Sequence, residues 1–196
     1  MRGVTWSVPA VLAAMLTCST SAAVAQAPAG SRSAWSGPFH IGTSRPALAP
    51  LGYVRYCRSN PAECRGAEAA FLKLDIGMIV LLDQINEMVN RSIEPVPEDA
   101  DDWVGYTSAG DCEDYALLKR TLLMQAGLPA GALRVAVADT PGGEPHAVLV
   151  VRSDEGDLVL DNLTDHIVTW NEAQLAWRKI ASEANPRLWF VIDAGM

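Results

Sequence analysis

Histidine, cysteine and basic residues are scarce in this chain of 196 residues, and each scarcity excludes a class of function. Three histidines and four cysteines leave no Cys/His ligand set for zinc outside the candidate catalytic residues. Lysine and arginine number 15 against 23 acidic residues, for a formal net charge of −8. A basic surface that could follow a phosphate backbone is therefore not expected. We expect neither zinc nor a nucleic-acid partner.

Long apolar runs are also missing. The apolar stretch near the start, residues 8–16, is too short to span a bilayer. It follows Arg2 and precedes the small-x-small sequence Ala23-Val24-Ala25, a pattern typical of a secretory signal peptide. Cys18 leaves a lipoprotein anchor as the alternative to a soluble exported protein. We predict a signal peptide over residues 1–25 cleaved after Ala25, a periplasmic location, and no transmembrane segment in the mature chain.

The remaining three cysteines separate into a pair and a single thiol. Cys57 and Cys64 are joined by a turn-forming stretch, and in an oxidising compartment such a pair predicts a disulfide. Cys112 is then the odd cysteine. A lone cysteine is commonly a buried structural residue, but the acidic neighbours of Cys112 are not typical of a core. We therefore interpret Cys112 as a reactive thiol.

The pattern of apolar residues predicts an α+β domain. Residues 26–52 are rich in Ala, Pro, Gly and Ser and should form an extended N-terminal arm, with one domain over residues 53–196. Helical periodicity predicts a long helix over residues 68–92, an acidic loop over 94–102, and a second helix from Cys112 to about Gly127. Short β-rich runs follow, with a short helix expected among them. The strands are expected at residues 133–138, 146–151, 158–161, 167–170 and 188–192, and the helix at 171–180. Helices first and antiparallel strands after predict helices packed on one face of a sheet.

The most informative segment is Asp111-Cys112-Glu113-Asp114, which follows Gly110 where a loop becomes a helix. Backbone N–H groups in a first helical turn lack intrahelical partners and, with the helix dipole, favour a thiolate. Downstream, His146 opens one apolar run and Asp161 ends another. This order of Cys, His and Asp is what a thiol nucleophile with an oriented base requires. The sequence therefore predicts a cysteine hydrolase.

These residues resemble the bacterial transglutaminase-like cysteine peptidases, which have a papain-like core. Members of that family include periplasmic proteases that trim large surface adhesins and so release biofilms. The resemblance spans roughly residues 50–170, and the Gly-Asp-Cys-Glu-Asp-Tyr segment is its specific signal. It rests on Val89-Asn90, Asp102-Trp103, Gly110-Asp-Cys-Glu-Asp-Tyr-Ala with Leu118-Lys119-Arg120, His146-Ala-Val-Leu, and Leu160-Asp161-Asn162.

The resemblance implies a role for each member of a triad. Cys112 is similar to the family's nucleophile, His146 to its base and later acid, and Asp161 to the residue that fixes the histidine tautomer. His166 is the competing histidine, but its polar neighbours favour a solvated loop. His40 lies in the arm and is given no role.

Three further residues are candidates for the site. Related folds imply that Trp103 lines the oxyanion site, although a hydrophobic plug over the helix is an equal alternative. Asp111 and Glu113 suit the helix dipole, yet their charges oppose a thiolate, so something must offset them. Some family members require calcium, and these two positions match the carboxylates beside the nucleophile. The alternatives for Asp111 and Glu113 are thus a calcium site and ordinary first-turn acids.

Three functions remain open from the sequence. The first is an exported cysteine endopeptidase that uses Cys112, His146 and Asp161 on a protein substrate such as a surface adhesin. The second is transglutaminase-type acyl transfer, in which an amine resolves the same acyl-enzyme. The third is a non-catalytic interaction module, against which the intact triad argues.

Overall fold

The computed structural model describes residues 40–96 and 102–193. The chain divides into two units, residues 1–34 and 35–196, and the second unit contains all of the described residues. The signal peptide and residues 26–39 of the arm lie outside the described residues, so those two predictions stay predictions. Within the described ranges, no helix is long and apolar enough to cross a membrane.

A seven-stranded antiparallel sheet organises the second unit, in the order β1-β9-β8-β4-β5-β6-β7. The strands are β1 (Gly42–Ala47), β4 (Leu133–Asp139), β5 (Pro145–Ser153), β6 (Gly156–Leu160), β7 (Val168–Thr169), β8 (Ala176–Ala181) and β9 (Trp189–Asp193). A small parallel pair joins β2 (Glu94–Pro95) to β3 (Ala109–Gly110). The helices are α1 (Leu51–Ser59), α2 (Ile76–Ser92) and α3 (Cys112–Gln125), with a 3₁₀ turn at Ala130–Ala132.

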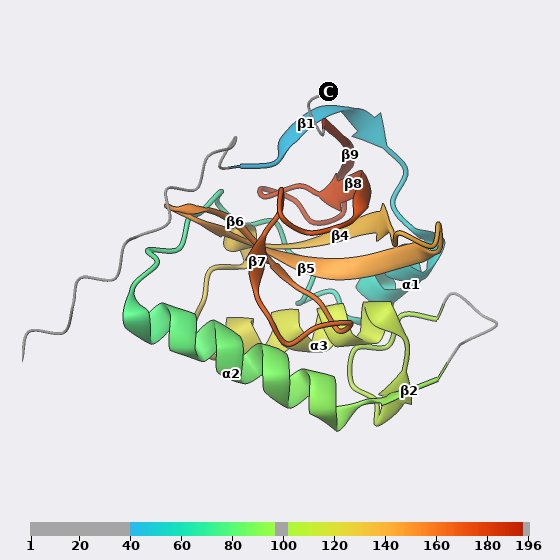
Figure 1. Ribbon diagram of the computed structural model, residues 1–196. Coiled ribbons are helices and arrows are strands. Elements are labelled where there is room, and N and C mark those ends of the chain that lie inside the picture. Colours follow the sequence, from blue (N-terminus) through green and yellow to red (C-terminus); the bar gives the residue numbers. More distant parts are fainter. Residues whose placement is uncertain (1–39, 97–101, 194–196) are drawn as a thin grey trace, which may run out of the picture. The chain divides into compact units, whose positions relative to one another are not determined.

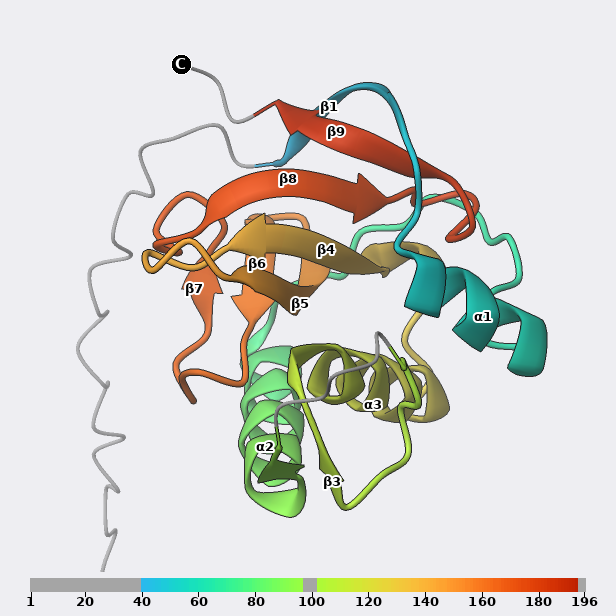
Figure 2. The same cartoon turned by 90° about the vertical axis from the view of Figure 1, so that its right-hand side faces the viewer.

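Helices α2 and α3 pack on the same face of the sheet, as both views show (Figures 1 and 2). Alternate residues of β5 explain this layering, because successive side chains of a strand point to opposite faces. Leu149 and Val151 join the cluster that contains Leu82 of α2 and Leu123 of α3. Val148 and its neighbours pack instead in a separate cluster on the other face. The predicted α+β class, with helices on one face of an antiparallel sheet, is confirmed.

Helix α3 is almost entirely surrounded by protein. Ten of its fourteen residues are buried, including the charged residues Lys119 and Arg120. A helix that packs on all sides is rigid, and its first residue, Cys112, is therefore held in a fixed position at the edge of the core. The predicted helix start at the cysteine is correct.

The structure differs from the expectations in three parts of the chain. The helix predicted from residue 68 begins at Ile76, because Asp75 caps it by accepting from Met78 N and Leu72 instead pairs with Ser153. The helix predicted over residues 171–180 is wrong, since β8 occupies its second half and pairs with both β4 and β9. Strand β1 and the start of α1 lie inside the segment expected to be an extended arm.

The predicted disulfide is present. Cys57 at the end of α1 and Cys64 in the following turn are bonded, with Cα atoms 5.5 Å apart and both side chains buried. The Arg187 guanidinium donates hydrogen bonds to the carbonyl oxygens of both cysteines, at 3.1 and 3.2 Å. Cys112 is the free cysteine of the described residues.

Candidate active site

Gly110 and Asp114 shape the turn that leads into α3. Asp114 is fully buried, and its Oδ1 accepts hydrogen bonds from Val104 N at 2.8 Å and Gly105 N at 3.2 Å. The loop that follows Trp103 is thereby tied to the first turn of the helix. A Cβ at position 110 would overlap the Asp114 carboxylate, so only glycine fits there. The Gly-Asp-Cys-Glu-Asp motif thus encodes one local structure that presents Cys112.

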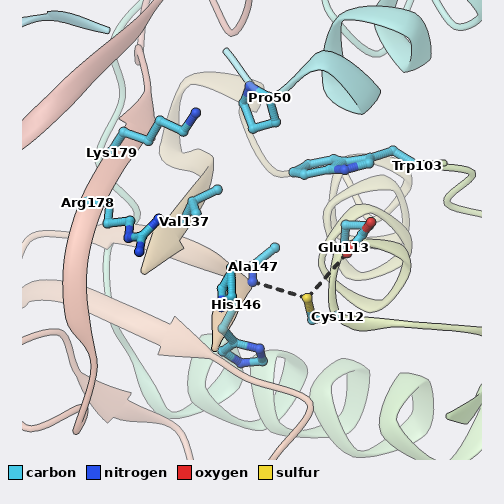
Figure 3. A pocket seen from close by; sticks show the side chains of 10 residues that line it. Pro50, Trp103, Cys112, Glu113, Val137, His146, Ala147, Arg178 and Lys179 are labelled. Carbon is cyan, nitrogen blue, oxygen red and sulfur yellow. Dashed lines mark hydrogen bonds between the residues drawn. The ribbon is translucent and has the colours of Figure 1, made fainter. Parts of the chain in front are cut away.

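The Cys112 thiol is partly buried and makes two hydrogen bonds. The thiol donates to Glu113 Oε2 at 3.3 Å, and Sγ accepts from Ala147 N at 3.3 Å (Figure 3). Burial raises the pKa of the thiol to about 12, the negative charges of Glu113 and Asp111 add to this, and the Ala147 N–H opposes it. Burial and the neighbouring acids therefore outweigh the acidifying effect expected from the helix start. The expected opposition of the neighbouring acids is present.

His146 and Asp161 form a buried pair. His146 Nε2 lies 2.7 Å from Asp161 Oδ1. The carboxylate can only accept, so Nε2 carries a hydrogen and, in the neutral ring, Nδ1 is left as the acceptor. Burial alone would raise the pKa of Asp161, but the hydrogen bond and charge of His146, the Leu163 N–H and the charge of Lys119 together hold it below its ordinary value. Asp161 therefore stays ionised at neutral pH.

A pocket of about 210 Å³ opens at this point (Figure 3). Its walls come from α3, from β4, β5 and β8, and from the segments before α1 and α3. They are lined by Pro50, Trp103, Cys112, Glu113, Val137, Pro145, His146, Ala147, Arg178 and Lys179. The Trp103 ring lies across the pocket from Arg178 and Lys179 in the close view, and it meets the Tyr53 ring edge-on at 5.4 Å. A substrate carbonyl in this pocket would have the thiol, the imidazole and the indole around it.

The structure brings most of the sequence-predicted residues together. Cys112, His146, Trp103 and Glu113 share the pocket, and Asp161 joins through its hydrogen bond to His146. His166 is exposed in the loop after β6 and does not line this pocket. His40 lies elsewhere, with Nε2 2.9 Å from Ser153 O.

Two features of the site were not foreseen. The Ala147 N–H that contacts the thiol is a backbone group, and a sequence carries no signal for its use. Lys119 is buried and interacts with the charge of Asp161, but the sequence analysis gave it no role. A lysine among the apolar residues of a predicted helix is a signal for a buried charged group, because lysine is rarely buried without a partner.

Asp111, Cys112 and Glu113 offer ligand atoms that lie within 4.8 Å of one another. Asp111 Oδ1 is buried and has no hydrogen-bond partner within residues 40–96 and 102–193. Burial and the neighbouring Asp111 raise the pKa of Glu113 to about 8. Two crowded carboxyl groups, one with an oxygen lacking a donor, are the donor chemistry that a hard cation prefers. The residues present therefore fit a calcium ion.

The sequence model of one protein family, the bacterial transglutaminase-like cysteine proteinases (BTLCP), matches residues 43–196. The chain belongs to this family. It is a cysteine peptidase of the transglutaminase-like class, and the free thiol in the pocket accords with that chemistry. No curated protein matches the chain.

Solved structures similar to this family member include three of LapG from Legionella pneumophila. The calcium-bound form has a TM-score of 0.49 and 22% identity, covering 58% of this chain and 68% of that one. The EGTA-treated form has a TM-score of 0.49 and 23% identity, covering 61% and 70%. A third LapG structure has a TM-score of 0.48 and 23% identity, covering 58% and 67%.

Proposed function

We propose that this family member is an exported cysteine endopeptidase whose catalytic triad is Cys112, His146 and Asp161. The observation that carries the proposal is the His146–Asp161 hydrogen bond at 2.7 Å, because it commits Nε2 and leaves Nδ1 to serve a thiol in the same pocket. This is the division of roles between the two ring nitrogens that a Cys-His-Asp triad uses.

The reaction follows from these groups. His146 Nδ1 takes the thiol proton, and the Cys112 thiolate attacks the scissile carbonyl carbon. The backbone N–H groups at the start of α3 stabilise the oxyanion, and Trp103 lines that side of the pocket. His146 then gives its proton to the leaving amine, which leaves an acyl-enzyme. Water, deprotonated by His146, hydrolyses the thioester and restores the thiol. Asp161 stabilises the imidazolium in both steps.

Asp111 and Glu113 would hold a calcium ion through their carboxylate oxygens. The ion would offset the negative charge beside Cys112, which otherwise keeps the pKa of the thiol high. Because the pKa of Glu113 is about 8 without the ion, its proton must leave on binding, so calcium affinity should rise between pH 6 and 8. Titration calorimetry in buffers of different ionisation enthalpy would measure that proton release. No calcium heat at pH 8 would leave these acids as first-turn residues.

Export and substrate are proposed on separate grounds. The Cys57–Cys64 disulfide favours an oxidising compartment such as the periplasm, in accord with the predicted signal peptide. The family resemblance favours a large surface adhesin as the protein substrate. Any large surface protein encoded near this gene is therefore the first substrate to test.

The test is cleavage of that protein by the mature chain in ¹⁸O-labelled water with calcium present. We expect defined fragments whose new carboxyl terminus carries ¹⁸O, and none with Cys112→Ala, which should still melt cooperatively. Incorporation of an added amine instead of ¹⁸O would show acyl transfer. Cleavage that survives in Cys112→Ala would reject the proposed nucleophile.

A further inference from the structure

Helix α2 holds the loop that follows β6 through two asparagines spaced one turn apart, Asn86 and Asn90. Asn86 is fully buried and Asn90 is partly buried. The loop, residues 161–167, begins with Asp161 and ends at the short strand β7, which pairs with β6 over only two residues. The sheet therefore supplies little to fix the loop, and its position depends on α2.

The side chain of Asn90 donates a hydrogen bond to the backbone of Asp161. Its Nδ2 lies 3.1 Å from Asp161 O, 3.2 Å from Thr164 O and 2.9 Å from Asp165 Oδ1. All three are acceptors, so the amide nitrogen must face them, and the opposite amide orientation would place Oδ1 against three other acceptors. Asn86 Nδ2 reaches only the middle of the loop, with contacts of 3.1 Å to Asp165 O and 3.4 Å to Thr164 O. The two side chains thus share Thr164 and Asp165, and only Asn90 also bonds Asp161.

The carboxylate of Asp161 is sensitive to its backbone position because its Oδ1 serves both His146 Nε2, at 2.7 Å, and Leu163 N, at 3.0 Å. Asp161 is also surrounded by other charges. Lys119 faces it from α3, and Asp165, on its own loop, lies 3.9 Å from Arg91 of α2. A shift of the loop would change the His146 contact and these charge interactions together.

We propose that Asn90 is a positioning residue of this peptidase, whose side-chain amide holds the Asp161 backbone so that the carboxylate stays aligned with His146. This rests on the proposed role of Asp161 in the triad. It gives a function to Val89-Asn90, a sequence feature that the triad itself leaves unused. If Asn90 had a structural role alone, it would only attach the loop to α2. Asn86 attaches the same loop without contacting Asp161, so it serves as the comparison.

The experiment compares Asn90→Ala with Asn86→Ala, using the ¹H NMR signal of the His146 Nε2–H as the readout. This hydrogen lies in the bond to Asp161, so in Asn90→Ala its downfield signal should move upfield or be lost to exchange with water. The rate of hydrolysis of a surface protein encoded near this gene should fall about 10-fold or more. Asn86→Ala should lower the melting temperature at least as much, with the His146 signal unmoved and the rate within about twofold of the parent.

Asn90→Leu keeps the approximate size of the side chain and removes the donor without adding a charge, so it should reproduce the change in the His146 signal if Asn90→Ala fails to fold. An unmoved signal in the folded Asn90 variants, or an equal change in Asn86→Ala, would overturn the proposal. Asp161→Ala tests the proposed triad separately from the positioning role. If it is fully active, the proposed triad fails. If it is inactive while the Asn90 variants keep the signal of the parent, only the positioning role fails.

Discussion

Removing the two carboxylates beside the nucleophile should make the calcium-free thiol more reactive. Glu113 and Asp111 are causes, after burial, of the raised pKa of Cys112, and their oxygens lie within 4.8 Å of the sulfur. At an effective dielectric constant of about 20, a unit charge at that distance opposes the thiolate by about 3.5 kcal/mol, or about 2.5 pKa units. The double variant Asp111→Asn with Glu113→Gln removes this opposition and leaves the burial of the thiol unchanged.

The expected change in rate is smaller than the change in thiolate population. A fall of about 2.5 pKa units raises the thiolate fraction at pH 7 about 300-fold, but a less basic thiolate is a weaker nucleophile. With the usual dependence of nucleophilicity on pKa, the net gain is about 20-fold. Calcium should bring a similar gain to the parent protein and none to the double variant.

The assay is the rate of Cys112 alkylation by iodoacetamide at pH 7 in EGTA, followed by mass spectrometry of the intact protein. Glu68→Gln with Glu155→Gln is the matched control, because it removes two acidic side chains outside the pocket. The control should react like the parent. Equal or slower alkylation of Asp111→Asn/Glu113→Gln would refute the electrostatic reasoning.

Two further predictions concern stability. Replacing Cys57 and Cys64 by alanine opens a closed loop of about eight residues and should lower the free energy of unfolding by about 2.5 kcal/mol. Calorimetry should show a melting temperature lower by about 5–10 °C, and an unchanged melting temperature would contradict this. Burial lowers the pKa of Lys119 to about 7, below its unfolded value, so the unfolded chain binds more protons between about pH 7 and 10.5 and this residue makes stability rise with pH there. Lys119→Met should therefore remove up to about 1.4 kcal/mol per pH unit from that slope in urea unfolding, and parallel pH profiles for parent and variant would count against the assignment.

The parts of the fold that were predictable from the sequence are those with a local signal. The Gly110 turn and the acidic first turn of α3 predict the helix that begins at Cys112. The sequences of β4, β5 and β6 are apolar enough to predict a buried sheet. Strand β8 was predicted as a helix because its sequence, Ala176–Ala181, has no strong β signal. Its pairing with β4 and β9 decides its conformation, and such tertiary effects override local propensity.

The candidate site divides in the same way. Cys112, His146 and Asp161 could be proposed from residue type and order, and the Cys57–Cys64 bond from spacing and compartment. The Ala147 N–H at the thiol and the asparagine contacts to residues 161–165 depend on how β5 and α2 cross the site. The high thiol pKa depends on burial, which a helix start alone does not reveal.

The measurement that tests the central claim most directly is cleavage of the surface protein by His146→Ala and His166→Ala, side by side with the parent. The account predicts that His146→Ala loses activity by at least about 100-fold, because the thiol loses its base while the nucleophile remains. His166, exposed and outside the pocket, should be replaceable with a change of less than about twofold. An inactive His166→Ala beside an active His146→Ala would contradict the proposed triad.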